Sequence, residues 1–233
     1  QTGVGVQGNN NLAVAAGGSF SGFNVKGTSN SAFGTNAGAF VEGTNNTSVG
    51  ARAGYVANGD NNASFGSSAG HFVTGGANVA SGYLSGAQVE GDNNVASGHA
   101  AGANIKGSGN IAIGDRAGTL STVTYRAVDE IGKGGVIVAG MQVVADNTVA
   151  FGTEAVASAD DAVAIGTGAQ AHGEKSISIG TGNIVNGARS GAIGDPSYIN
   201  GDDSYAIGNN NKIDVGTKAA FILGNNVTIA AAL

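Results

Sequence analysis

The chain has 233 residues, a length that suits one or two domains, and a formal net charge of −6 at pH 7. Glycine accounts for 43 residues, and charged residues make up only 11% of the chain. The few charges and many apolar residues argue against disorder, and the glycines lack the three-residue spacing of collagen. The acidic balance argues against nucleic acid as a partner, because phosphate-binding surfaces need clustered lysine and arginine.

The sequence contains no recognisable membrane-spanning or export segment. No run of about 18 apolar residues is present, so we expect no transmembrane helix. No signal peptide pattern is visible, although a mature fragment would already have lost one. The absence of cysteine excludes disulfides and thiol chemistry, and it fits a chain exported unfolded through an oxidising space.

Residues 1–118 are predicted to form an array of 16-residue coils. Residues 3–22 look like a distorted first coil, and residues 23–118 divide into six blocks, such as AQVEGDNNVASGHAAG at 87–102. Periods this short suit one coil of a solenoid, with two short strands joined by tight turns at glycine and asparagine. Burial then comes from the stacking of coils, so the interior needs no large side chains.

Two columns of this array predict that the coils stack in register. One polar column would place Lys26 on Glu42 and Glu90 on Lys106, about 4.8 Å apart. A second column is predicted either to form an amide ladder up the stack or only to tolerate the turn. It contains Asn30, Asn46, Asn62, Asn78, Asn94 and Asn110.

Residues 119–144 interrupt the repeats and are predicted to be an insert or connector. Two β-rich stretches, TVTYRAV and GVIVAGMQVV, flank a turn at GKGG. One interpretation is a connector that lets the coil narrow from 16 to 14 residues. The other is a projecting hairpin that contacts a neighbouring chain or a ligand through Arg126, Asp129, Glu130 and Lys133.

An array of 14-residue coils is predicted for residues 145–233, and a slipped copy, AFILGNNVTI, ends it. In both arrays the middle residue of the clearest strand is always small. A face exposed to water would favour charged residues and threonine, and a face turned to the chain's own core would favour larger side chains. We therefore expect this column to lie against another copy of the chain. The predicted interface residues are Ala32, Ser48, Ser64, Ala80, Ala96, Ala112, Ala150, Ala164, Ser178, Ala192 and Ala206.

The 14-residue array resembles the head repeats of trimeric autotransporter adhesins with YadA-like heads. The resemblance rests on DNTVAFGTEAVAS at 146–158, DDAVAIGTGAQA and EKSISIGTGNIV, and residues 194–213 are similar to an insert motif of these heads. The 16-residue array matches more loosely, in a style shared with some tail-fibre proteins. The resemblance implies an all-β, left-handed parallel β-roll solenoid that assembles as a homotrimer.

The same resemblance implies a location and a role. Such heads are displayed on the outer surface of Gram-negative bacteria and attach to host extracellular matrix, cells or other surfaces. The neck, stalk and membrane anchor of the family have no counterpart in the sequence, so we expect a head fragment. Its expected partners are two further copies of itself and a host matrix protein or surface receptor.

No constellation of residues predicts catalysis, a cofactor or a metal. His71, His99 and His172 lack ligand spacing and are predicted to lie at the surface. The paired acids in GDDS and ADDA are expected to cap turns, because they match no calcium loop, and no phosphate-binding lysine motif is present. We therefore expect a protein that is not an enzyme.

Two other functions are compatible with a solenoid. A structural spacer would lift another binding module from the surface. An ice-binding solenoid would need a regular array of threonine, and Thr28, Thr44 and Thr74 occupy no single column. The sequence therefore favours the adhesin head, with the spacer or a phage tail-fibre-like β-roll as its alternatives.

Overall fold

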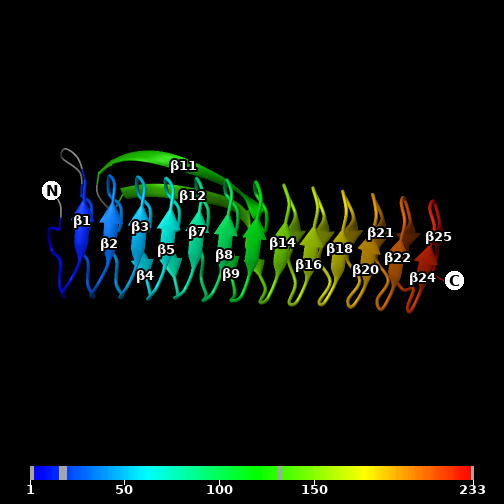
Figure 1. Cartoon of the computed structure of the whole chain (residues 1–233). Coiled ribbons are helices and arrows are strands. Elements are labelled where there is room, and N and C mark those ends of the chain that lie inside the picture. The colour runs from blue at the N-terminus through cyan, green and yellow to red at the C-terminus, as the bar shows by residue number, and fades with distance from the viewer. Residues whose placement is uncertain (1–2, 16–19, 131–132, 232–233) are drawn as a thin grey trace.

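Short strands stack along one axis to form a parallel β-solenoid (Figure 1). The computed structural model describes residues 3–15, 20–130 and 133–231, and only the backbone within 121–140. Strands and turns make up this described part, and no helix long and apolar enough to cross a bilayer occurs in it. The predicted all-β parallel solenoid is confirmed.

One face of the solenoid is a 13-stranded parallel sheet that runs the length of the molecule. Each strand has three residues, and the side chains of the first and third residues point to the opposite side of the sheet from that of the middle residue. The strands are β1 (Leu12–Val14), β2 (Ser31–Phe33), β3 (Thr47–Val49), β5 (Ala63–Phe65), β7 (Val79–Ser81), β8 (Val95–Ser97), β10 (Ile111–Ile113), β14 (Val149–Phe151), β16 (Val163–Ile165), β18 (Ile177–Ile179), β20 (Gly191–Ile193), β22 (Tyr205–Ile207) and β24 (Phe221–Leu223).

A second face is made of two-residue strands. In the C-terminal half these form a six-stranded sheet of β15 (Val156–Ala157), β17 (Gln170–Ala171), β19 (Ile184–Val185), β21 (Tyr198–Ile199), β23 (Lys212–Ile213) and β25 (Thr228–Ile229). In the N-terminal half β4 (Ala57–Asn58) pairs with β6 (Val73–Thr74), and β9 (Ile105–Lys106) pairs with β13 (Val143–Val144). Single bridges, such as Glu42 with Asn58, join the other coils of this half.

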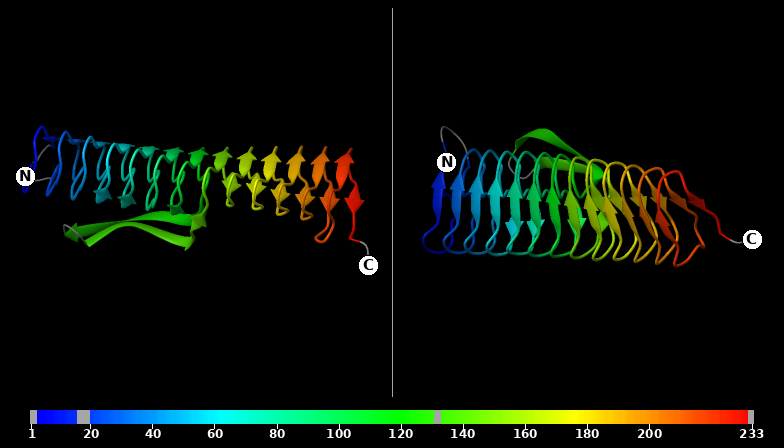
Figure 2. Two further views of the ribbon diagram at one scale, coloured as in Figure 1. Left: turned by 90° about the horizontal axis from the view of Figure 1, so that it is seen from below. Right: turned by 45° about the vertical axis from the view of Figure 1, so that its right-hand side comes forward.

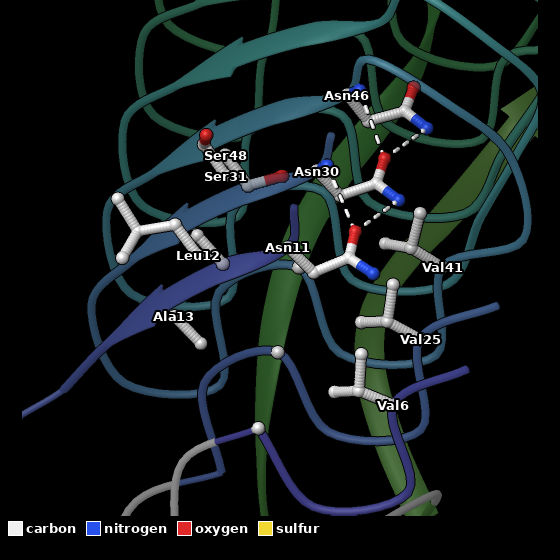
Figure 3. A pocket seen from close by; sticks show the side chains of 14 residues that line it. Val6, Asn11, Leu12, Ala13, Val25, Asn30, Ser31, Val41, Asn46 and Ser48 are labelled. Atoms are coloured by element: carbon white, nitrogen blue, oxygen red, sulfur yellow. Dashed lines mark hydrogen bonds between the residues drawn. The ribbon is translucent and has the colours of Figure 1, made fainter. Parts of the chain in front are cut away.

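A buried asparagine ladder holds the 16-residue coils in register (Figure 3). Each asparagine of the column accepts the backbone N–H of the next with its Oδ1, as Asn78 does from Asn94 at 3.0 Å. Its Nδ2 donates to a corner carbonyl, as Asn78 does to Gly91 O at 2.9 Å. The ladder starts one coil earlier, at Asn11, and ends at Thr148. Of the two predictions for this column, the amide ladder is confirmed.

The two residues of each asparagine pair in these blocks have different structural roles. The first residue of a pair takes the left-handed turn, as Asn61 and Asn93 do with φ of 61° and 58°. The second residue, Asn62 or Asn94, is buried and joins the ladder. Asparagine serves both positions because it tolerates positive φ and carries both a donor and an acceptor.

The polar column also stacks as predicted. Lys26 Nζ lies 2.5 Å from Glu42 Oε1, and Lys106 Nζ lies 3.4 Å from Glu90 Oε2. The four side chains are about half exposed, and such pairs contribute about 0–1 kcal/mol each, so they report the register rather than maintain it.

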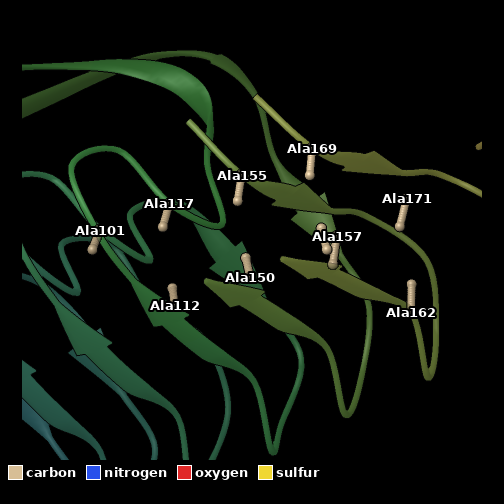
Figure 4. Close-up of a cluster of buried hydrophobic side chains, with 10 residues drawn as sticks. Ala101, Ala112, Ala117, Ala150, Ala155, Ala157, Ala162, Ala169 and Ala171 are labelled. Atoms are coloured by element: carbon tan, nitrogen blue, oxygen red, sulfur yellow. The ribbon is translucent and has the colours of Figure 1, made fainter. Parts of the chain in front are cut away.

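The column of small residues lies inside this chain's own roll. All eleven residues are at most 4% exposed in the single chain, so the prediction that they contact another copy is wrong. The residues concerned are Ala32, Ser48, Ser64, Ala80, Ala96, Ala112, Ala150, Ala164, Ser178, Ala192 and Ala206. Figure 4 shows Ala112 and Ala150 among the other alanines of the interior.

The interior is narrow where these strands face a glycine, and this is why their middle residues are small. In the 16-residue coils the middle residue of the strand faces a glycine on the opposite wall of the same coil. A Cβ on Gly102, whose φ is +58°, would lie 2.8 Å from the Cβ of Ala96. Only alanine or serine opposite glycine fits between walls this close, since real Cβ atoms do not approach to such distances.

An antiparallel hairpin is inserted into one coil. Its strands are β11 (Leu120–Glu130) and β12 (Lys133–Met141), which pair with each other. The coil keeps its register across the insertion, because Ala112 pairs with Ala150 and Ile105 with Val143. Ser108 stacks on Asp146, which stands 38 positions later in the sequence. Without residues 121–142 the difference would be 16, the coil length before the hairpin, so the coils shorten to 14 residues only after the hairpin.

The hairpin projects from the second face and runs back over the 16-residue coils towards the N-terminal end (Figure 2). It lies on the side of the roll away from the 13-stranded sheet. A projecting hairpin, rather than a connector between coil sizes, therefore accounts for this segment.

We predict that Asn78→Ala destabilises the roll by about 2–4 kcal/mol. The substitution leaves the buried N–H of Asn94 and the carbonyl of Gly91 without their partners, and each such loss costs about 1–3 kcal/mol. Urea unfolding followed by circular dichroism measures the change. The control is Asn58→Ala, an exposed position outside the ladder, where we expect a change within about 0.5 kcal/mol. Equal effects of the two variants would show that the ladder is not structural.

Candidate functional site

The outward residues of the 13-stranded sheet form a long exposed apolar surface, which we call the outer stripe. It is built from the first and third residues of the three-residue strands, and each coil contributes at least one apolar group to it. The exposed large members are Leu12, Val14, Phe33, Val49, Phe65, Val79, Ile111, Phe151, Ile165, Ile193, Tyr205, Ile207, Phe221 and Leu223. Phe65 and Phe151 are 43% and 53% exposed, so rings of this surface are open to a partner.

Apolar residues continue along the stripe without a break in register. Val149, Val163 and Ile177 follow one another in paired positions, and Phe151, Ile165 and Ile179 do the same on the other side of the strand. At Gly191 the ring of Tyr205 takes the free space, because a Cβ there would lie 2.7 Å from Tyr205 Cδ1. A contiguous apolar surface of this length is typical of a protein–protein interface.

The sequence indicates that the strands have two different faces, but alternation alone does not tell which face is exposed. The alternation correctly separates Val149 and Phe151 from Ala150. In the 16-residue blocks a glycine stands six residues after each small residue, as Gly102 does after Ala96, and this glycine is the signal that marks the small side as the inside.

The charged residues of the hairpin cannot be placed at a site. Arg126, Asp129, Glu130 and Lys133 lie in the segment whose backbone alone is described, so their side-chain positions fall outside the described residues. Arg126 pairs with Gly135 across the two strands, and Glu130 pairs with Lys133 near the tip. Their predicted contacts with a partner remain a prediction.

His71 is buried, and the prediction that it lies at the surface is wrong. Its ring stacks on Tyr55 with the centroids 5.0 Å apart and meets the ring of Phe72 edge-on at 4.4 Å. Neither ring nitrogen has a hydrogen-bond partner, and burial lowers the pKa of His71 to about 4, with a smaller contribution from the charge of Arg52. The imidazole therefore acts as a neutral member of an aromatic row that also includes Phe40.

The other two histidines reach the surface to different extents. His99 is exposed, with its ring stacked on Tyr83 and Nδ1 2.7 Å from Asp115 Oδ1. His172 is half-buried, and burial lowers its pKa. Its Nδ1 lies 2.6 Å from Ser158 Oγ, and its Nε2 lies 3.0 Å from Gln170 Oε1.

The paired acids lie at corners and bind backbone amides, as predicted. Asp160 Oδ1 accepts the N–H of Asp146, and Asp202 Oδ1 accepts the N–H of Ala188, each at 2.9 Å. Asp161 and Asp203, the second acids of the pairs, adopt positive φ. Within the described residues, no group of three or more acidic or histidine side chains is arranged to hold a metal ion.

The comparisons with known proteins locate one family in the 14-residue array. The family model of the YadA head domain repeat matches residues 145–169 in two copies. Residues 145–169 are therefore similar to YadA head repeats. No curated protein matches the chain.

The matched residues coincide with the first coils of the narrower array. They span β14, β15 and β16, in which Ala150 and Ala164 point inward and Phe151 and Ile165 belong to the outer stripe. The YadA head family suggests an adhesin-like head of a trimeric autotransporter, a structural type rather than an enzymatic one. The resemblance drawn from the sequence is therefore confirmed.

We predict that acid destabilises the roll through His71. The folded state holds the pKa near 4 while the unfolded chain has the ordinary value of 6.5, so stability is full above pH 6.5 and falls as the pH drops towards 4. The loss amounts to at most about 3 kcal/mol. Melting midpoints at pH 7.5 and pH 4.5 measure it, and His71→Phe, which retains an aromatic ring, reduces the difference between them. An unchanged difference in this variant would exclude His71 as the cause.

Proposed function

We propose that the chain is the head of a surface adhesin that assembles as a homotrimer through the outer stripe. The observation that supports this most directly is the continuous exposed apolar surface on one face of the roll. A monomer would leave Phe65, Phe151 and Ile193 in water along its whole length, which soluble monomers rarely do. Three chains with their stripes around a common axis would bury them together.

The number three comes from the family rather than from the geometry of one chain. YadA-type heads belong to trimeric autotransporters, and the repeats at 145–169 lie in the part of the stripe where both outward positions are large. In this arrangement the second face, with the hairpin, points outward.

The adhesive mechanism that we propose is multivalent. Equivalent outer surfaces recur with each coil and with each of three chains, so weak contacts add up without a deep pocket. The targets would be host extracellular matrix, cells or other surfaces, and the chain would be displayed on the outer surface of a Gram-negative bacterium. A structural spacer is the alternative, because a regular solenoid is also a stiff rod.

The double variant Phe151→Glu with Ile165→Glu tests the assembly and the adhesion together. The two residues pair in adjacent coils, so charges there would face one another around the trimer axis. Sedimentation of the wild-type head should give a trimer and that of the variant a monomer, and retention on immobilised matrix proteins should fall by roughly tenfold or more.

The matched control for this experiment is Tyr198→Glu. Tyr198 is 48% exposed but lies on the opposite, six-stranded sheet, so this variant should remain a trimer. A monomeric wild-type head would overturn the assembly proposal. A trimeric head that binds no matrix protein, cell or abiotic surface would overturn the adhesin and favour the spacer.

A further inference from the structure

A notch opens at one corner of the roll, beside the 13-stranded sheet. It has a volume of about 440 Å³ and lies where three consecutive coils turn into strands β5, β7 and β8. We call it the corner notch, and its lining residues are Gly59, Asp60, Asn61, Gly75, Gly76, Ala77, Asp92 and Asn93.

The first half of the notch is the space above Gly76. The coils on either side have Asp60 and Asp92 at this position, and each carboxylate accepts a backbone N–H of the preceding coil. Gly76 carries no side chain that could bond to the next coil in this way. Packing keeps the residue small, since a Cβ on Gly76 would lie 2.9 Å from Asp60 O.

Ala77 makes the second half of the notch, and packing does not limit its size, because it is exposed. It adopts a φ of 56°, a left-handed conformation that asparagine tolerates better than alanine. Asn61 and Asn93 hold the same position in the coils on either side, with φ of 61° and 58°. A small residue retained at a position that favours asparagine suggests that the space beside it is used.

An exposed aromatic ring stands in the same coil, on the opposite side of the sheet. Gly76 and Ala77 precede strand β7, and Tyr83 follows it. Tyr83 is 45% exposed. The three preceding coils have smaller residues at this position, namely Thr35, Ala51 and Ser67.

The ring of Tyr83 is held in place by a short stack. It lies almost parallel to the ring of His99, with the centroids 5.6 Å apart and an angle of 6° between the planes. His99 is fixed in turn by Asp115, whose Oδ1 lies 2.7 Å from Nδ1. A tyrosine that is already ordered loses little conformational entropy on binding, which is why such rings serve as interface anchors.

The outer stripe is thin at the level of this ring. The third residue of the strand is Phe65 in β5, but it is Ser81 in β7 and Ser97 in β8. Two serines bury less apolar area than larger residues would, so the stripe alone attracts another chain less here. Tyr83 supplies an aromatic group at the level where the stripe has lost one.

We infer that Tyr83 of one chain inserts into the corner notch of the next chain in the trimer. This inference rests on the proposed function, because it requires three chains with their outer stripes around one axis. Rotation about that axis keeps equivalent coils at the same height, and it brings the corner after a strand next to the corner before the equivalent strand of the next chain. Tyr83 and Ala77 lie at these two corners of one coil, so each of the three seams joins a ring to a notch.

The chemistry of the notch suits tyrosine. The floor is backbone and the methyl group of Ala77, which suit the face of a ring, and the rim carries Asp60 and Asp92. Each carboxylate uses Oδ1 for a backbone N–H, and a carboxylate has a second oxygen that accepts. The hydroxyl of Tyr83 therefore has an acceptor on either side of the notch.

Disulfide cross-linking of the intact head tests the contact, because the chain has no cysteine of its own. The variant Ala77→Cys with Tyr83→Cys should form a covalent trimer on oxidation, seen by electrophoresis without reducing agent. A disulfide within one chain is excluded, since the strand between the two residues separates them by roughly 13 Å, and a disulfide spans at most about 7 Å between Cα atoms.

The matched control is Asn45→Cys with Tyr83→Cys. Asn45 holds the position of Ala77 two coils earlier, about 10 Å away along the axis, so this variant should not cross-link. Equal cross-linking of the control, no cross-linking of the Ala77 variant, or a covalent dimer as the end product would overturn the inference. A trimeric head that fails to cross-link keeps the proposed assembly, whereas a monomeric wild-type head overturns both.

A second variant, Ala77→Asn, fills the notch with the residue that the neighbouring coils carry. It should fold, because asparagine tolerates the left-handed φ, and circular dichroism checks this. We expect a roughly tenfold or greater weakening of the trimer in sedimentation, both in this variant and in Tyr83→Ala. Tyr198→Ala, which removes an exposed tyrosine of the opposite sheet, should sediment as the wild type does. Unchanged association of the Ala77 and Tyr83 variants would contradict the contact.

Discussion

The structure depends on the stacking of coils at one strand spacing, in register. Each short strand has only two or three residues, and a strand of that length has no stability alone. Its backbone groups pair with the coils before and after, as Val95 N does with Asn110 O at 2.8 Å. The asparagine ladder adds a buried side-chain bond at each step, and an out-of-register coil would leave those amides unpaired.

The same stacking decides which groups face inward. The two walls of a 16-residue coil stand so close that Ala96 meets Gly102, and larger residues are excluded from the middle of the three-residue strand. The large apolar side chains of these strands consequently lie on the outer stripe, where a single chain cannot bury them. The proposed assembly would thus be a consequence of the narrow space between strand and glycine, and it would leave the opposite face, with the hairpin, outside the trimer axis.

Much of this could be predicted from the sequence because the repeat itself encodes the stacking. The column spacing alone predicted the bond between Lys26 and Glu42. The side of each strand that faces inward could not be predicted from alternation, because alternation separates two faces but does not say which of them is buried. The usual rule that large residues face the core fails here, because Ala150 and not Phe151 is buried.

The remaining misses concern contacts that no repeat encodes. His71 occurs in a column with Phe23 and Tyr55, and only the packed rings show that it belongs to their row. The path of the hairpin back over the 16-residue coils is likewise not encoded by any repeat. Tertiary placement of the hairpin therefore had to come from the structure.

Amide hydrogen exchange at the ladder asparagines tests the stacking most directly. Asn46, Asn62, Asn78, Asn94 and Asn110 each donate their backbone N–H to the side chain of an asparagine one coil away. If the coils stack as described, these amides exchange as slowly as those of the 13-stranded sheet. Exchange at the rate of an unstructured chain would contradict the stacking and the assignment of the faces that follows from it.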